Sequence, residues 1–217
     1  MPVPYQVVQR TGYVPSEAHE HQPGGPRMGS AEVAIEVAGL PVEVKGVEFR
    51  LLDTVPPTDG RVPQKGAVWN AVEGKIEGGT FRGRAEIPAG GWYRLELRGA
   101  DGEKEVWSGS VEPFGVGEVF LVAGQSYAES ANDERLRVQE PQGRVTIYDR
   151  VSGTWRVAHD PETPPNEERG TLWPAFGDYL MPIVRVPVGI CNVAVGGTSS
   201  RQWLPGTPLY EGLVKGG

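Results

Sequence analysis

Apolar and polar residues alternate along much of the first half of the chain. Residues 32–37 and 47–51 show this alternation in part, and residues 42–44 repeat it over a shorter stretch. A period of two is typical of strands that bury one face and expose the other. The pattern therefore predicts short strands in this half of the chain.

The clearest supersecondary element in this half is a hairpin. Residues 93–98 alternate cleanly, residues 99–102 have the glycines of a turn, and residues 105–111 return as a second strand. Other turns are expected at Asp59-Gly60, Gly78-Gly79 and Gly90-Gly91. Together these signals predict a small antiparallel β-sandwich over residues 31–112.

Three tryptophans lie in the predicted sandwich, namely Trp69, Trp92 and Trp107. Such large aromatic side chains commonly belong to the core of a small sandwich. On the surface, however, they would offer flat faces to which a sugar ring can stack. Both interpretations stay open at this point.

Residues 1–30 are rich in proline and glycine and show little periodicity apart from residues 5–8. We expect an extended arm that lies on another surface or is partly disordered. His19-Glu20-His21 resembles a metal-binding pair, but no third ligand is near in sequence. A solvated tail is therefore the expected state, and no metal site is predicted.

The hydrophobic pattern changes near Pro113. Residues 119–123 are continuously apolar and are followed by Gly124, which predicts a strand buried on both faces. Strands are also expected at residues 144–148 and 154–157, and a solvated loop at 160–170.

A helix and one more strand complete the expected elements. Trp173, Phe176 and Leu180, followed by Ile183 or Val184, recur at helical spacing, with Thr171 as the expected start and Pro174 in the first turn. Residues 186–195 form another nearly continuous apolar strand, and it ends at a glycine turn, 196–199.

Two buried strands with a helix between them imply parallel neighbours in one sheet. Ser126 and Gly196-Gly197 then lie at the same carboxyl edge, where ligands bind in open α/β sheets. A serine there can act as a nucleophile, and glycine N–H groups can receive a developing oxyanion. The alternative is two structural turns, and the Gly-x-Ser-x-Gly elbow of α/β-hydrolases is not met, because Ala128 replaces its second glycine.

Composition narrows the classes of partner. The 31 glycines and 20 prolines favour turns and short strands over long helices. A formal net charge of −7 argues against nucleic acid or an anionic membrane as the main partner. Cys191 is the only cysteine, so neither an intrachain disulfide nor a cysteine-based zinc site is expected.

The chain shows no sign of a membrane span or of a secretion signal. No apolar run is long enough to cross a membrane, and the first residues lack the basic start and apolar core of a signal peptide. The protein is therefore expected to be cytoplasmic, or to have had a signal removed. No cofactor is expected.

Several blocks together resemble the sialate O-acetylesterase and acetylxylan-esterase branch of the SGNH hydrolases. They are residues 117–126 ending in Gly-Gln-Ser, Trp173-Pro174 with its helix, residues 186–199 with Gly-Gly-Thr-Ser, and 203–205. The match covers about residues 113–210, and the preceding segment is similar to the β-sandwich that often precedes this catalytic domain.

The resemblance implies a fold, an activity and a set of site residues. The fold is an N-terminal antiparallel β-sandwich followed by a partial flavodoxin-like α/β/α domain over 113–217, and the reaction removes O-acetyl groups from sugars. Ser126 is the expected nucleophile, and Gly197 and Gly196, with the Ser126 amide, form part of the oxyanion hole. Gln125, Arg201 and Trp203 are expected beside the acetylated carbohydrate, Arg201 as a hydrogen-bonding fork and Trp203 as a stacking face. For Trp203 a surface loop that covers the sheet is the alternative.

The sequence departs from the family pattern in two places. Tyr127 stands where the family usually has Asn, and the family's terminal Asp-x-x-His, which activates the serine, has no counterpart among His19, His21 and His159. The expected explanation is that the chain is an N-terminal part, nearly inactive alone, whose incomplete sheet pairs with a second copy or with the missing portion. The alternative function is a non-catalytic carbohydrate-binding or interaction module.

Overall fold

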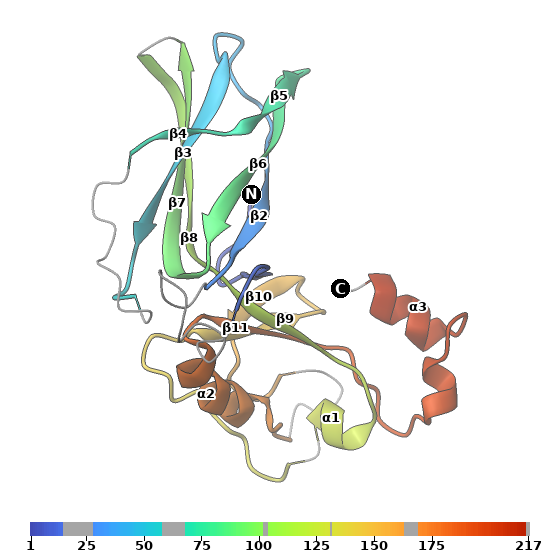
Figure 1. Cartoon of the computed structure of the whole chain (residues 1–217). Helices are drawn as coiled ribbons and strands as arrows, with labels where there is room; N and C mark the ends of the chain where they lie inside the picture. Colours follow the sequence, from blue (N-terminus) through green and yellow to red (C-terminus); the bar gives the residue numbers. More distant parts are fainter. Residues whose placement is uncertain (15–27, 58–67, 102–103, 131, 163–168, 216–217) are drawn as a thin grey trace. The chain divides into compact units, whose positions relative to one another are not determined.

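The computed structural model describes residues 1–14, 28–57, 68–101, 104–130, 132–162 and 169–215. They form two compact units, Met1–Gly117 and Glu118–Gly217. The expected histidine-containing tail with His19 and His21, and the turn at Asp59-Gly60, lie outside the described residues. The first unit is all-β, and the second combines a mostly parallel sheet with helices (Figure 1).

The first unit contains two layers of antiparallel strands (Figure 1). One layer has the order β2-β6-β5, and the other has the order β8-β7-β3-β4. Their bounds are β2 Ser30–Val37, β3 Gly46–Asp53, β4 Asn70–Ala71, β5 Glu73–Glu77, β6 Thr80–Pro88, β7 Gly90–Asp101 and β8 Lys104–Val122. Alternation places every second residue of β2 and β7 in the core, as the period of two predicts.

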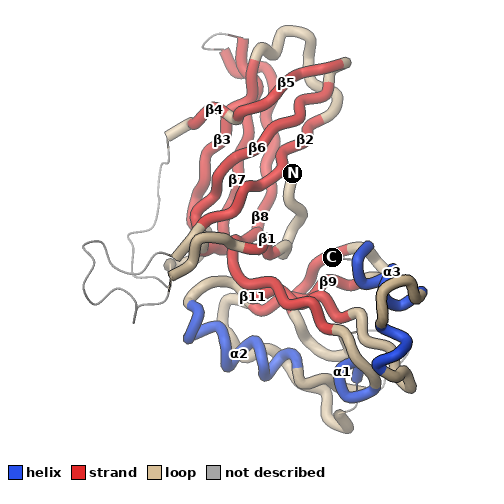
Figure 2. The backbone as a smooth tube through the Cα atoms, turned by 45° about the vertical axis from the view of Figure 1, so that its right-hand side comes forward, coloured by secondary structure: helices blue, strands red, loops and turns tan. Residues whose placement is uncertain are grey.

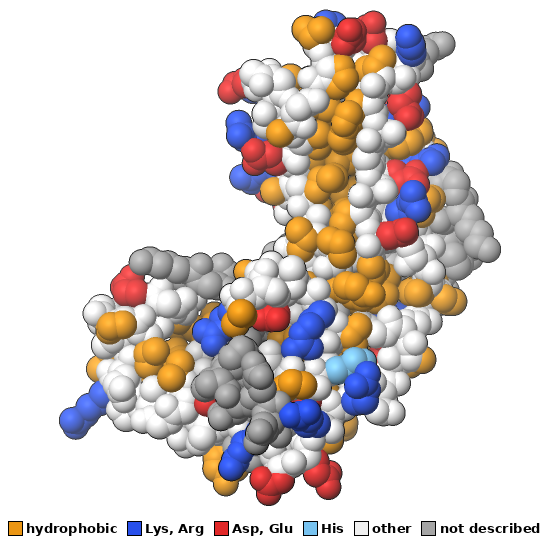
Figure 3. Space-filling view, turned by 180° about the vertical axis from the view of Figure 1, so that it is seen from behind, with side chains coloured by type: hydrophobic (Ala, Val, Ile, Leu, Met, Phe, Trp, Pro, Cys, Tyr) orange, Lys and Arg blue, Asp and Glu red, His pale blue; other side chains and the backbone are white. Residues whose placement is uncertain are grey.

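The core of this unit consists of apolar side chains that are almost completely buried. Phe81, Ile87, Leu95, Leu97 and Phe114 are each at most 2% exposed. The predicted hairpin is present as β7 and β8, with Leu95 opposite Val111. From behind, hydrophobic side chains of this unit form a stripe along the strands, with charged side chains on both sides (Figure 3). The antiparallel sandwich expected from the alternating pattern is therefore observed.

Part of the predicted N-terminal arm is a strand that packs against the sandwich. Strand β1 (Val7–Gln9) pairs in parallel with β8, with Val7 opposite Gly115. Val7 is only 2% exposed, and Arg10 donates a hydrogen bond from Nη1 to the Met28 carbonyl at 2.9 Å. The rest of the predicted arm, residues 15–27, lies outside the described residues.

One expectation for this unit needs correction, and the open question about its tryptophans is answered. The short strand predicted at residues 42–44 is a turn, in which Val42 is 87% exposed and Val44 is buried. Trp92 is a core residue, whereas Trp69 and Trp107 are half-buried. A pattern of alternation over three residues is too short to distinguish a strand from a turn that buries one side chain.

Strand β8 is much longer than the sequence predicts, since it runs from Lys104 to Val122 without a break at Pro113. Its last residues belong to the second unit, where the sheet has the order β10-β9-β11-β8. The other strands are β9 Val145–Asp149, β10 Thr154–Val157 and β11 Val188–Asn192. Strand β11 lies parallel to β8 and to β9, as predicted from the helix between the buried strands, while β10 is antiparallel to β9.

Helix α2 (Trp173–Val184) covers one face of this sheet (Figure 2). Its apolar stripe packs on a core that contains residues of β8, β9 and β11. The packing is close at Gly177, where an added Cβ would lie 2.1 Å from Val145 Cγ1. The stripe contains Trp173, Phe176, Leu180 and Val184, whereas Ile183 is 60% exposed and does not belong to it.

One of the two central strands, β8, is less buried than the sequence predicts, whereas the other, β11, is buried as expected. All residues of β11 are buried, as a strand covered on both faces requires. In β8, however, Leu121 is 45% exposed, and Val119 and Phe120 are half-buried. The prediction of a fully buried strand before Ser126 is therefore wrong, because periodicity does not show whether a second layer covers the strand.

Helix α2 begins differently from the prediction. Its N-cap residue is Leu172, which makes no side-chain cap. Thr171 contributes all the same, since its hydroxyl accepts a hydrogen bond from the Trp173 amide at 3.2 Å and donates to Asp160 Oδ1 at 2.9 Å. Thr171 thus links the helix start to the loop that precedes it.

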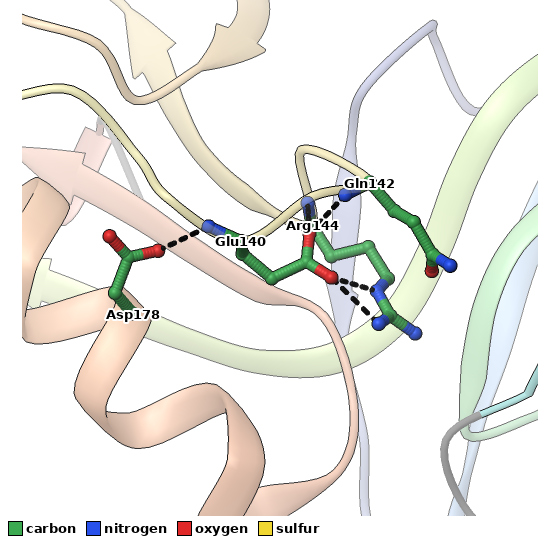
Figure 4. Close-up of polar contacts among 4 residues, drawn as sticks. All are labelled: Glu140, Gln142, Arg144 and Asp178. Atoms are coloured by element: carbon green, nitrogen blue, oxygen red, sulfur yellow. Dashed lines mark hydrogen bonds and ion pairs between the residues drawn. The ribbon is translucent and has the colours of Figure 1, made fainter.

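A buried ion pair holds the turn before β9 (Figure 4). Glu140 Oε1 accepts from Nη2 and Nε of Arg144 at 2.7 and 3.0 Å, and Oε2 accepts from the backbone amides of Gln142 and Arg144. From α2, Asp178 accepts the Glu140 amide at 2.9 Å. Because both side chains are nearly inaccessible, this network fixes the turn to the sheet and the helix.

Candidate active site at the carboxyl ends of β8 and β11

The turns that follow β8 and β11 lie side by side. The ladder between the strands continues past their ends, since the Val193 amide donates to the Val122 carbonyl at 2.8 Å. The Val195 amide then donates to the Gly124 carbonyl at 2.9 Å. The Gly-Gln-Ser and Gly-Gly-Thr-Ser segments, 70 residues apart from Ser126 to Gly196, are thus joined by backbone hydrogen bonds at the same sheet edge.

Ser126 is the first residue of the short helix α1 (Ser126–Ser130), and it is half-buried. Its Oγ donates a hydrogen bond to Gln125 Oε1 at 3.0 Å. Gln125 and Tyr127 on either side are exposed, so Tyr127 is directed to solvent at the position where Asn is usual in the related pattern. The serine is therefore accessible at the edge of the sheet and is not part of a core.

Two residues that the sequence analysis did not assign to the site hold α1 in place. Trp173 Nε1 and Asn192 Nδ2 both donate to the Ala128 carbonyl, at 2.9 and 3.0 Å. Asn192 Oδ1 in turn accepts the Ala194 amide at 3.1 Å, which ties the helix to the end of β11. Asn192 could have been found in the sequence, because it is the only strongly polar residue in the apolar run 186–195.

Glu129 lies directly beneath the glycine turn. The side chain is 7% exposed, and its Oε2 lies 2.6 Å from where a Cβ on Gly196 would be. Ser126 and Glu129 are three residues apart on α1, which places them on one side of the helix. A side chain at Gly196 would therefore require the Glu129 carboxylate or the turn to shift.

The other glycine of the turn has a different role. Gly197 is exposed and has φ +74°, a left-handed conformation that favours glycine, and a Cβ there would meet nothing within 4 Å. The surface of the turn beside Gly197 is therefore open, as a backbone donor to a substrate oxygen requires.

We expect Gly196→Ala to reduce the esterase activity proposed below by about ten- to a hundredfold, because the added methyl group displaces Glu129 or the turn. The cost in the free energy of unfolding should be about 1–3 kcal/mol. A second substitution, Glu129→Asp, shortens the buried side chain and should restore part of the activity and part of the free energy of unfolding. Initial rates and urea unfolding check this expectation, and Gly212→Ala is the control, because an added Cβ there meets nothing within 4 Å and the backbone is not left-handed.

The segment after the glycine turn folds back on it. Thr198 Oγ1 donates to the Val195 carbonyl at 2.7 Å, and it accepts the indole N–H of Trp203 at 3.1 Å. Trp203 closes a 3-10 helix, Ser200–Trp203, and is half-buried, whereas Arg201 on the same helix is exposed. Trp203 therefore braces the turn, and the expected contacts of Arg201 and Trp203 with a substrate stay predictions.

His159 lies at the opposite edge of the sheet from Ser126. Strand β10 runs antiparallel to β9, and the Ala158 amide donates to the carbonyl of Val145, the first residue of β9. Since β9, β11 and β8 are parallel, His159 is next to the start of the strands and Ser126 follows their end. This arrangement excludes His159 as the base for Ser126 in this structure.

The environment of His159 is that of a structural residue. Its Nδ1 accepts the Val138 amide at 3.0 Å. Burial, and then the charges of Arg137 and Arg156, lower its pKa, while Asp178 opposes this effect.

Within the described ranges, no group of three or more His, Cys, Asp or Glu side chains is arranged to hold a metal ion. Among the helices of these ranges, none is long and apolar enough to cross a membrane. Cys191 is buried in β11, and burial raises the pKa of its thiol.

Comparisons with known proteins give distant similarities. No family model and no curated protein matches the sequence. A carbohydrate acetylesterase from Xanthomonas citri is 18% identical, with a TM-score of 0.46, over 93% of this chain and 41% of that one. A protein from Arabidopsis thaliana is 20% identical, with a TM-score of 0.37, over 45% of this chain and 48% of that one. The chain thus spans less than half the length of both proteins. Similarities at this level do not assign a function, which must be argued from the residues of the site.

Proposed function

We propose that the second unit is a serine esterase domain of the SGNH type, with a flavodoxin-like fold, which removes O-acetyl groups from carbohydrates. The observation that carries the proposal is the hydrogen bond from Val195 to the Gly124 carbonyl. It joins the turn before an accessible serine to an exposed glycine turn at the carboxyl edge of parallel strands.

The proposed reaction is acyl transfer in two steps. Ser126 Oγ attacks the carbonyl carbon of the acetyl group, the carbon–oxygen bond to the sugar breaks, and the sugar hydroxyl leaves with a proton. Water then hydrolyses the acetyl-serine to acetate and regenerates the Ser126 hydroxyl. In both steps the backbone N–H groups of Ser126 and Gly197 stabilise the negative charge on the carbonyl oxygen.

Among the described residues, neither a histidine nor a carboxylate is hydrogen-bonded to Ser126 Oγ. The hydroxyl donates to the Gln125 side-chain amide, which holds it but is not a base. His159 is the only histidine among the residues that the structure describes, and it lies at the other edge. A serine without an adjacent base is a weak nucleophile, so we expect slow hydrolysis that an external base accelerates.

The test is hydrolysis of 4-nitrophenyl acetate and release of acetate from acetylated xylan and from O-acetylated sialic acid. Ser126→Ala should remove at least about 99% of the rate above the uncatalysed reaction. Added imidazole should accelerate the wild-type chain more than the Ser126→Ala variant, because it substitutes for the missing base. Ser152→Ala, an exposed serine in the turn between β9 and β10, is the matched control.

A second readout does not depend on turnover. In the presence of imidazole as external base, a fluorophosphonate should form a covalent adduct on Ser126, detected by the mass of the peptide, because the reaction needs a base that activates the serine as well as an oxyanion hole. Equal hydrolysis by the wild-type and Ser126→Ala chains, together with no adduct on Ser126, would exclude the proposal.

A further inference from the structure

An ordered ladder of ion pairs covers the outer face of β3 and β7 in the first unit. Glu48 lies opposite Arg98, and Arg50 lies opposite Glu96, each pair with a hydrogen bond of 2.6 Å. Trp69 packs on this ladder, with the guanidinium carbons of Arg50 and Arg98 both 4.6 Å from its ring centre. The arginines hold the indole by cation–π contacts, so Trp69 is a fixed aromatic wall on the surface.

A depression lies beside this wall because the next strand has small residues. On β8, Ser108 and Ser110 are exposed, and Gly109 lies between them. Ser110 is opposite Glu96 on β7, so the floor of the depression lies directly beside the ladder of ion pairs. The result is a cavity of about 380 Å³, lined by Arg50, Trp69, Arg94, Glu96, Leu97, Glu105 and residues 108–110.

The lining favours a neutral ligand with many hydroxyl groups. Two arginines and two glutamates balance in charge, and Glu96 is already paired with both Arg50 and Arg94. The remaining guanidinium donors, carboxylate acceptors and serine hydroxyls can bond to groups that both donate and accept. An indole face beside them suits the apolar C–H face of a sugar ring.

We propose that this cavity is a carbohydrate-binding site for neutral sugars. The larger cavity of the same unit, about 920 Å³, suits such a ligand less well, because Val44, Val47, Val72, Ile76 and Phe81 supply much of its wall. The site is separate in sequence and chemistry from Ser126, and it binds sugar without cleaving it.

The proposal is tested with the whole chain in native gels that contain soluble xylan, hydroxyethylcellulose or galactomannan, with polygalacturonate as the anionic counterpart. At least one neutral polymer should retard the wild-type chain. Trp69→Ala should weaken this binding about five- to tenfold, the effect typical of one aromatic contact. Ser110→Tyr fills the cavity from an exposed strand position while Trp69 and its two arginines stay in the chain, and should weaken binding as much.

Arg82→Ala is the matched control, since it breaks an exposed arginine–glutamate pair on β6, in the other layer, and should bind as the wild type does. Ser126→Ala should also bind normally, which separates this site from the proposed esterase. Circular dichroism shows that each variant is folded. No retardation by any neutral polymer, retardation by polygalacturonate alone, or unchanged binding of both Trp69→Ala and Ser110→Tyr would overturn the proposal.

Discussion

Replacing Glu162 by Gln should make the protein more stable above pH 8 and should flatten the dependence of its stability on pH. Glu162 is 2% exposed, and neither carboxyl oxygen has a hydrogen-bond partner of normal geometry in the described part of the chain. Burial, and then the charge of Asp160, raise the pKa of this carboxyl to about 8, although Thr171 and Arg156 oppose the shift. The folded protein therefore keeps a proton that the unfolded chain releases.

The direction of the effect follows from the two pKa values. Below the ordinary value of 4.5 both states hold the proton, and stability from this group is fully present. Between pH 4.5 and about 8 only the unfolded chain ionises, so the free energy of unfolding falls, by on the order of 3–5 kcal/mol at most. Glutamine does not ionise and should not show this loss.

Urea unfolding followed by tryptophan fluorescence at several pH values measures the effect. The informative quantity is the difference between the wild type and Glu162→Gln, because His159 and the other titrating groups then cancel. Glu211→Gln, at an exposed glutamate of α3 (Pro208–Lys215), is the control. Parallel curves for the wild type and Glu162→Gln would show that Glu162 ionises normally in the folded state.

Removing one partner of the buried pair between Glu140 and Arg144 should be the most destabilising single change among the ion pairs described. Glu140→Ala leaves a guanidinium whose side chain is 5% exposed, together with two backbone amides that lose their acceptor. A buried charge without its partner costs about 3–5 kcal/mol of the free energy of unfolding. The turn before β9 should also lose its order.

Replacement of both partners should be far less harmful. In Glu140→Leu with Arg144→Met no buried charge is left, and such exchanges are often close to neutral. Arg82→Ala, which breaks an ion pair with Glu36 whose side chains are 64% and 57% exposed, should cost less than about 1 kcal/mol. A Glu140→Ala variant as stable as Arg82→Ala would mean that water or a rearranged turn compensates the arginine.

The local sequence was sufficient to predict part of the regular elements, but strands β5 and β6 and helix α3 were not predicted. The alternation in residues 93–98 and 105–111 identified the β7–β8 hairpin, and the helical spacing from Trp173 to Val184 identified the face that packs on the sheet. The apolar run 186–195 was correctly assigned to a buried strand beside β8. These features depend on periodicity, which a residue's near neighbours in sequence determine.

The candidate site could be predicted in part. Two apolar strands separated by a helix implied that Ser126 and Gly196 share an edge, and the Val195 to Gly124 hydrogen bond joins their turns. Glu129 and Asn192 were missed, because their roles depend on contacts with residues more than 60 positions away. Asn192 did leave a local signal, as the one strongly polar residue of an apolar run, whereas no local pattern reports the proximity of Glu129 to Gly196.

The sequence by itself therefore determined the β7–β8 hairpin, the strands β9, β10 and β11, the apolar face of α2, and that the turns after β8 and β11 share one edge of the sheet. The tertiary structure decided the exposure of Leu121, the length of β8 beyond Pro113, and the position of His159 at the far edge of the sheet. It also decided that Glu140 and Glu162 are buried. The physical reason is that burial and charge environment arise from residues distant in sequence, whereas secondary structure follows largely from periodicity and turn residues close together in the chain.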